Sequence, residues 1–276
     1  MSSPPNPLFE PSQTSPDRES TDLQPIQVAP PSRVEDPVWT GWEVLALGAA
    51  TVFTILVFLF GITLAAHRLL YPNLPWIEVA KFPGLIVLSQ VLAYLLVLGF
   101  MYILVKRDHQ QDFWQAIRWN WPQKWSVYVF AGIGLAIGLQ AFARLLPIPK
   151  NLPMDQFFQT TREAYLLSFF GVTFAPLLEE LFFRGFLYPV LARRLEVAGG
   201  VVLTALGFAA IHGAQLQYSW GPVLVIFIVG LVLTLVRAMT KSVAASLLVH
   251  IAYNGTLSLM MFVFTGGFRH LERLNQ

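Results

Sequence analysis

The chain has 276 residues, of which 55% are hydrophobic and only 12% are charged. A soluble domain usually carries about 25% charged residues, so this composition excludes an ordinary soluble protein and favours a membrane protein. The net charge of +2 gives no reason to expect a nucleic-acid partner, and the lack of cysteine excludes disulfides, thiolate metal sites and a cysteine nucleophile.

Residues 1–38 differ in composition from the rest of the chain. They are rich in proline, serine and acidic residues, and no apolar periodicity runs through them. Such a segment buries too little apolar surface to fold, so we predict a disordered tail over 1–38. The remainder, 39–276, is predicted to be one membrane-embedded helical domain.

Apolar segments follow one another after Trp39. A hydrocarbon core about 30 Å thick requires roughly 20 helical residues to cross it. The candidate segments are about 43–66, 84–105, 126–147, 164–192, 199–213, 220–238 and 242–265. Pro176 lies inside the fourth segment and predicts a bend there, because proline removes a helical hydrogen bond. The predicted fold class is all-α: a polytopic membrane protein of about seven or eight transmembrane helices with a buried polar site.

The lysines and arginines near the segment ends give a small bias toward a cytoplasmic N-terminus. Short loops and the lack of an evident eukaryotic retention signal favour a bacterial protein. We therefore expect a multi-pass protein of the bacterial cytoplasmic (plasma) membrane.

Polar residues at membrane depth are concentrated in the second half of the chain. An ionisable residue in a membrane segment costs about 2.5–3.5 kcal/mol on insertion scales, so such residues are functional candidates that face inward. The candidates are Glu179, Glu180, Arg184, His212, His250 and Asn254.

Helical geometry divides the two adjacent glutamates. Glu180 and Arg184 are four residues apart and share one face, where they can pair. Glu179 lies about 100° around the helix and points elsewhere. This division suits a general base beside a structural ion pair. The alternative is a plain buried salt bridge that fixes helix packing.

The histidines lie on other segments. His212 ends the fifth segment, four residues after Phe208, and a lone histidine at a helix end is more often interfacial than catalytic. His250 and Asn254 share one face of the seventh segment, where they can direct two donors at a developing oxyanion. The alternative for this pair is a polar clamp between helices.

Three sequence motifs occur in order: E-E-L-F-F-R at 179–184, F-A-A-I-H at 208–212 and H-I-A-Y-N at 250–254. Together they resemble the CPBP family, also called Abi, of membrane proteases, which includes the type II CAAX prenyl endopeptidases. The resemblance implies a protease core at about 125–265, with each motif on its own membrane helix.

The resemblance also implies roles for individual residues. Glu179 would activate the attacking water, His212 would help to position or deprotonate it, and His250 with Asn254 would stabilise the oxyanion. The supporting residues would be Glu180, Arg184 and Phe208. The predicted function is an intramembrane endopeptidase that acts on a peptide or membrane-protein substrate within the lipid bilayer.

No cofactor is favoured for this reaction. The family has long been labelled metalloprotease, and one carboxylate with two histidines is a plausible zinc set. If zinc takes part, its ligands would be Glu179, His212 and His250.

Two other functions remain open at this point. One is a non-catalytic membrane protein, such as an immunity or scaffold factor. The other is a proton-coupled transporter, since intramembrane Glu, Arg and His also mark proton relays. An inverted repeat would support a transporter, and none is visible in the sequence.

Overall fold

The computed structural model describes Met1 and residues 36–147, 149 and 157–275. The predicted disordered tail lies outside these residues, apart from Met1 and residues 36–38. Val34–Gln276 forms one compact unit. All elements found in its described residues are helices, which confirms the all-α fold class.

Six helices of the described chain are long and apolar enough to cross a membrane. They are Gly41–Leu69 (α1), Pro83–Asp108 (α3 and the π-helix η1), Trp125–Ala143 (α5), Thr161–His212 (α6 to α8), Trp220–Thr240 (α9) and Val243–Phe264 (α10). Three short helices lie between them, namely α2 (Trp76–Val79), α4 (Phe113–Ala116) and η4 (Ala214–Leu216), and η5 (Leu271–Asn275) follows α10. The number of spans agrees roughly with the prediction, because the 52-residue span Thr161–His212 contains the fourth and fifth predicted segments.

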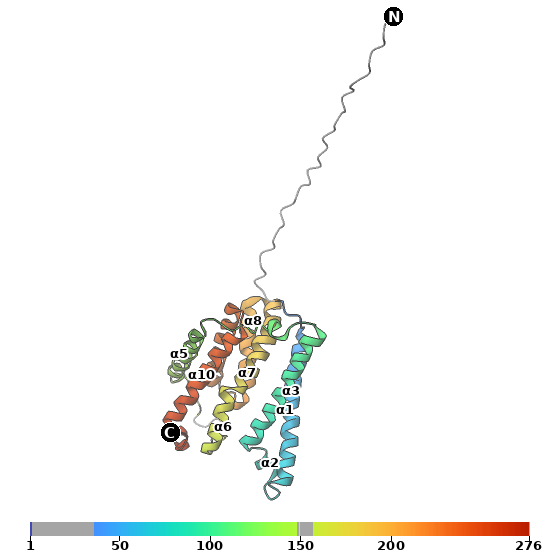
Figure 1. Ribbon diagram of the computed structural model, residues 1–276. Helices are drawn as coiled ribbons and strands as arrows, with labels where there is room; N and C mark the ends of the chain where they lie inside the picture. The colour runs from blue at the N-terminus through green and yellow to red at the C-terminus, as the bar shows by residue number, and fades with distance from the viewer. Residues whose placement is uncertain (2–35, 148, 150–156, 276) are drawn as a thin grey trace. The chain divides into compact units, whose positions relative to one another are not determined.

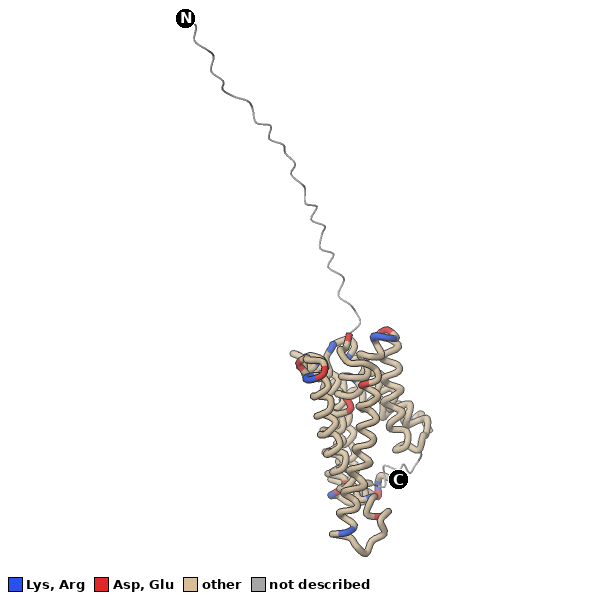
Figure 2. Tube along the Cα trace, turned by 90° about the vertical axis from the view of Figure 1, so that its right-hand side faces the viewer, with Lys and Arg blue, Asp and Glu red and all other residues tan. Residues whose placement is uncertain are grey.

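The helices pack in an order that places α6 and α7 centrally (Figure 1). α1 packs on α3 at one side, and α5 packs on α10 at the other. α6 and α7 lie between these pairs, because α6 contacts both α3 and α10. α9 packs on α8 and α10. Charged residues gather mainly at the two ends of the helices, with a few inside the bundle (Figure 2).

The long span is interrupted where the two glutamates lie. α6 (Thr161–Val172) ends before Thr173, which has φ −114° and ψ −72°. α7 (Phe174–Glu180) contains Pro176 near its start and passes directly into the π-helix η3 (Leu181–Leu187). Pro176 has no N–H to donate to the preceding turn, so one helical hydrogen bond is missing there. This missing bond explains why the helix breaks between α6 and α7. The predicted bend therefore exists, slightly before the proline itself. π-Helical turns are often found at functional sites.

A reversal inside α8 (Tyr188–His212) returns the chain toward α7. Leu195 (φ −126°, ψ 16°) and Glu196 (φ 63°, ψ 173°) are non-helical and divide α8 into two limbs. Gly200 lets the limbs approach closely, because a Cβ there would lie 2.8 Å from Ala192 Cα. Glu179 and His212 are nearly equally far from this reversal on either side. Since both limbs rise by about 1.5 Å per residue, His212 returns to the level of Glu179.

Residues just before α1 pack against the π-helix. Trp39 is 1% exposed, donates its indole N–H to Phe186 O (3.0 Å) and stacks on the Phe186 ring at 4.4 Å. Asp36 pairs with Arg193 at 2.8 Å. These contacts connect the start of the folded unit with the segment that follows the glutamates.

We predict that Gly132→Ala in α5 destabilises the protein by about 1–3 kcal/mol through overpacking. A Cβ at Gly132 would lie 2.4 Å from Val249 O and 2.7 Å from Ala252 Cβ on α10. The measurement is the thermal unfolding midpoint of the purified protein in detergent. Gly134→Ala is the control, because a Cβ there meets no atom within 4 Å. Equal midpoints for the two variants would contradict the close α5–α10 approach.

Candidate active site

The Glu180 carboxylate joins three side chains in the interior of the bundle. Its Oε1 atom accepts from Arg184 Nη1 at 2.9 Å and lies 2.8 Å from His250 Nδ1. Glu180 and Arg184 are fully buried, and the His250 side chain is 4% exposed. The predicted Glu180–Arg184 pair is thus confirmed. Its contact with His250 of α10 links it to a second motif.

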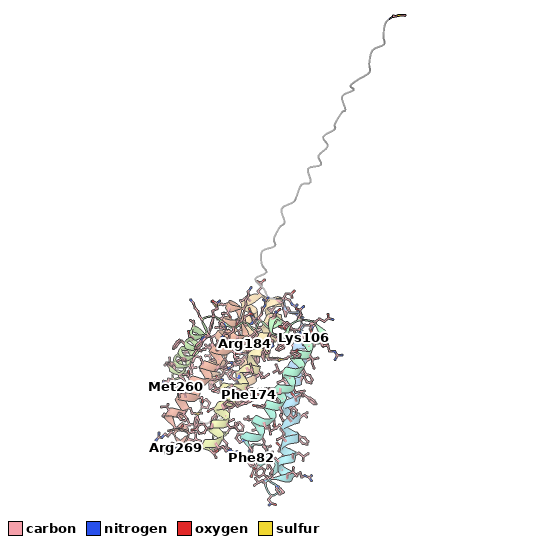
Figure 3. The ribbon with its side chains drawn as sticks, in the orientation of Figure 1. Phe82, Lys106, Phe174, Arg184, Met260 and Arg269 are labelled. Carbon is pink, nitrogen blue, oxygen red and sulfur yellow. The ribbon has the colours of Figure 1, made fainter. Side chains whose placement is uncertain are left out.

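Arg184 is further held by α9 and by aromatic rings. Its Nη2 donates to Gly230 O at 3.1 Å, and its guanidinium carbon lies 4.6 Å from the centre of the Phe208 ring. A Cβ at Gly230 would lie 3.1 Å from Ala205 Cα, so the glycine allows α9 to approach α8 at this level. Arg184 lies inside the bundle, toward the end that carries Lys106 (Figure 3). A buried cation over an aromatic face gains about 2 kcal/mol, which helps to offset its desolvation.

Glu179 faces away from this ion pair, toward the two histidines. Its Oε1 lies 3.9 Å from His212 Nε2, and its Oε2 lies 3.7 Å from His250 Nε2. The Glu179 side chain is 16% exposed, in contrast to the fully buried Glu180. The structure therefore brings Glu179, His212 and His250 together, from α7, α8 and α10. Both distances are longer than a direct hydrogen bond, so Glu179 bonds neither ring directly.

The hydrogen-bond partners of the two Nδ1 atoms determine the tautomers of His212 and His250. His212 Nδ1 lies 2.8 Å from Phe208 O, and a carbonyl oxygen can only accept, so this Nδ1 carries the hydrogen. Glu180 is ionised beside Arg184, so His250 Nδ1 likewise carries a hydrogen. Each neutral ring therefore presents the lone pair of Nε2 to Glu179. Three groups that can accept a hydrogen bond therefore converge at this point.

Phe208 occupies the centre of the cluster. It is 2% exposed, and its ring centre lies 4.8 Å from that of His212 and 5.8 Å from that of His250. The same ring contacts Arg184. Phe208 therefore packs against the Arg184 guanidinium and against both histidine rings.

Asn254 lies one helical turn after His250 and contacts a different helix. Its Nδ2 donates to Gly171 O of α6 at 2.7 Å. This bond clamps α10 to α6 near the α6–α7 break. The amide group has two hydrogens, so one remains for a second acceptor.

Three contributors to the cluster were not found by sequence reasoning. Gly230 and Gly171 take part through backbone carbonyls, which leave no signature in the sequence. The Tyr94 ring of α3 stacks on Phe170 of α6, just before the α6–α7 break, although Tyr94 lies in a segment without any motif. A tyrosine in an apolar helix is commonly a packing residue, so nothing in the sequence singled out Tyr94.

Within the described residues, no group of three or more His, Cys, Asp or Glu side chains is arranged to hold a metal ion. His250 Nδ1 is engaged by Glu180, and the Nε2 atoms of His250 and His212 are directed toward Glu179. We derive no step through a metal.

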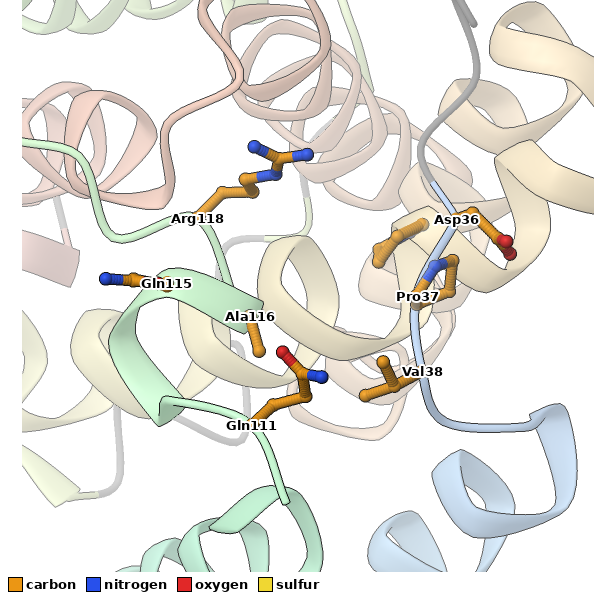
Figure 4. Close-up of a pocket in the computed structure, with 8 residues that line it drawn as sticks. Asp36, Pro37, Val38, Gln111, Gln115, Ala116 and Arg118 are labelled. Atoms are coloured by element: carbon orange, nitrogen blue, oxygen red, sulfur yellow. The ribbon is translucent and has the colours of Figure 1, made fainter. Parts of the chain in front are cut away.

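A polar pocket of about 200 Å³ lies elsewhere, where residues before α1 meet α4 (Figure 4). Its lining includes Asp36, Gln111, Gln115 and Arg118. None of the predicted site residues lines it.

Comparison with known proteins finds one family model that is similar to part of the chain. Residues 161–256 match the model of the type II CAAX prenyl endopeptidase Rce1-like family. This range contains all three motifs, and the match confirms the resemblance to the CPBP and CAAX proteases. No curated protein and no solved structure matches the chain significantly.

We predict that Arg184→Met destabilises the protein by about 3–5 kcal/mol, because it leaves Glu180 buried without its partner. The double variant Glu180→Leu/Arg184→Met should be less destabilised than Arg184→Met alone, since it leaves no uncompensated charge. Thermal unfolding midpoints in detergent provide the measurement.

Asp36→Asn provides the matched control for this prediction. It breaks an ion pair in which the aspartate side chain is 82% exposed, so the loss should not exceed about 1 kcal/mol. An Arg184→Met midpoint close to that of Asp36→Asn would contradict the assignment of a buried, energetically coupled pair.

Proposed function

Because the site-bearing part of this chain matches the Rce1-like CAAX prenyl endopeptidases, we propose that the protein is an intramembrane endopeptidase that hydrolyses peptide bonds with an activated water. The observation that carries this proposal is the Glu179 carboxylate between the Nε2 atoms of His212 and His250, beside a buried ion pair. A carboxylate and two histidines around one point can remove, hold and return protons during hydrolysis.

In the proposed first step, a water molecule occupies the space among Glu179, His212 and His250. Glu179 takes one proton of this water while the oxygen attacks the peptide carbonyl carbon. The His212 lone pair accepts a hydrogen bond from the same water and holds it in line. The carbonyl double bond opens, and the negative charge moves to its oxygen.

His250 and Asn254 are proposed to stabilise this oxyanion. His250 Nδ1 donates to Glu180, so Nε2 can donate to the oxyanion only when the ring is an imidazolium. In this proposal His250 binds the additional proton before the water attacks and keeps it throughout, so the leaving amine receives only the proton that Glu179 removed from water. Asn254 offers the amide hydrogen that is not bonded to Gly171.

The intermediate then collapses by cleavage of the carbon–nitrogen bond. The oxyanion reforms the carbonyl, and the leaving amine takes the proton that Glu179 removed from water. Glu179 is thereby ionised again. The step needs no covalent intermediate and no serine or cysteine.

We also propose a peptide or membrane-protein substrate and a location in the bacterial cytoplasmic membrane. The support for a membrane substrate is the position of the site, which lies within membrane-spanning helices. Several large apolar side chains on α1 and α3 are exposed on the surface of the protein, where they can contact lipid.

We predict that Glu179→Ala abolishes cleavage, with a loss of at least about 100-fold, because the general base is removed. The measurement is comparative proteomics of membranes from cells with the wild-type or variant protein, which should reveal a cleavage product that the variant fails to form. Glu272→Ala is the control, since that carboxylate is 66% exposed and lies outside the cluster.

Purified Glu179→Ala that cleaves as fast as the wild type would refute the proposed mechanism. Glu179→Gln tests the non-catalytic immunity or scaffold alternative. If this variant accumulates in the membrane and preserves the cellular phenotype, binding rather than hydrolysis accounts for the function.

We predict that cleavage persists in a strong metal chelator, because the proposed base is a carboxylate and its water needs no Lewis acid. The measurement is product formation by purified protein before and after chelation. Activity that disappears with the chelator and returns with zinc alone would instead assign Glu179, His212 and His250 as zinc ligands.

A further inference from the structure

Trp39 links the residues before α1, which lie outside the matched residues 161–256, to the helix that carries the candidate site. Its indole N–H donates to Phe186 O at 3.0 Å, across 147 positions of the chain. Its ring stacks on the Phe186 ring, with centres 4.4 Å apart and planes inclined by 28°. All eight tryptophans lie in described residues, and Trp39 alone is buried, while the others are exposed or half-buried.

The bond from the indole ends on the π-helix η3, which follows the two glutamates and contains Arg184. The Tyr188 N–H donates to Phe183 O, five residues earlier, as in a π-helix. The next residue, Pro189, has no N–H, so one carbonyl of this turn lacks its helical donor. The indole N–H therefore reinforces η3 where the backbone bonding of the helix is incomplete.

The Trp39 ring also belongs to an apolar cluster around the two glutamates. Leu178 and Leu181, which flank Glu179 and Glu180 in the chain, are buried in the same cluster as Trp39. Protein interiors are closely packed and transmit small displacements. A displacement of the indole therefore reaches the residues on both sides of the glutamates.

The backbone on both sides of Trp39 is itself held in place. Before it, Arg193 Nη1 of α8 donates to Asp36 Oδ1 at 2.8 Å and to Pro37 O at 3.0 Å. After it, Thr40 is the N-cap of α1 and forms both bonds of a capping box. These contacts hold the indole at a defined position, so that it can direct η3 rather than follow it.

We propose that Trp39 is a positioning residue of the candidate site, whose indole N–H keeps η3 π-helical and thereby directs Arg184 at Glu180. An α-helix bonds four residues back and a π-helix five, so a change of η3 to an α-helix would turn Arg184 relative to Glu180. Because one Glu180 oxygen contacts both Arg184 and His250, the displacement would also reach His250. The consequence for hydrolysis rests on the proposed function, whereas the placement of Arg184 can be measured without any substrate.

The test observes the Arg184 guanidinium by NMR. Purified full-length protein in detergent is labelled with isotope-enriched arginine, and the Arg184 Nε–H signal is identified by its loss in Arg184→Lys. The position of this signal depends on the orientation and the surroundings of the guanidinium group. A protein that is less stable but keeps Arg184 in place retains the signal at its wild-type position.

Trp39→Phe keeps an aromatic ring to stack on Phe186 and removes the N–H. We expect the Arg184 signal to move by more than its line width, because Phe186 O loses its donor and η3 relaxes. Trp39→Leu, which removes the aromatic ring together with the N–H, should move the signal in the same direction. Trp42→Phe is the matched control, because Trp42 lies three residues later and is 79% exposed, and its signal should stay at the wild-type position.

An Arg184 signal that stays in place in Trp39→Phe overturns the proposal, because Trp39 is then only a packing residue. If Trp39→Phe does not accumulate as folded protein, Arg193→Ala replaces it. This variant removes the contacts to Asp36 and Pro37, and the Arg193 side chain is 35% exposed. The Arg184 signal should move in this variant as well, and an unchanged signal overturns the proposal.

Cleavage provides the second measurement, on the product that Glu179→Ala fails to form. A misplaced group can cost up to about 100-fold in rate, so we expect Trp39→Phe to yield at least about threefold less product per folded protein than Trp42→Phe. Equal yields would overturn the consequence for hydrolysis. Should Glu179→Ala still form the product, the protease mechanism fails, while the Arg184 signal still decides the role of Trp39.

Discussion

The Glu180 carboxylate determines the arrangement of the whole site. One of its oxygens contacts both Arg184 Nη1 and His250 Nδ1, in a region from which water is excluded. A charge in such surroundings is tolerated only when it is paired and hydrogen-bonded, so these groups cannot move independently. Because Arg184 also donates to Gly230 O, the same network connects η3, α9 and α10.

This network gives two adjacent glutamates different chemistry. Glu180 contacts Arg184 and His250 Nδ1, whereas Glu179 faces the Nε2 atoms of His212 and His250. Glu180 also fixes the His250 tautomer, much as an orienting carboxylate does for a catalytic histidine. Pairs of titratable groups in contrasting environments are a usual sign of an acid–base site.

Small residues allow the helices to come close enough for these contacts. Gly200 permits the reversal of α8 against Ala192, Gly230 permits α9 to approach Ala205, and Gly132 permits α5 to approach Val249. Helices in lipid gain little from hydrophobic association, so close backbone contact at small residues is their main route to packing. At the α8 reversal and at α9 the close approach also serves the site, since it returns His212 to Glu179 and brings Gly230 O to Arg184.

The sequence by itself determined the membrane class, most of the span boundaries, the motif residues and the Glu180–Arg184 pair. Composition, the length of an apolar segment and the helical period are local properties of one segment, so they can be read directly from the amino-acid sequence. The tertiary structure alone decided that Glu179 faces both histidines, that Glu180 holds His250, and that Gly230 and Gly171 contribute their backbone carbonyls. These contacts join different helices, and the rotation of each helix about its axis is set by packing against its neighbours rather than by its own sequence period.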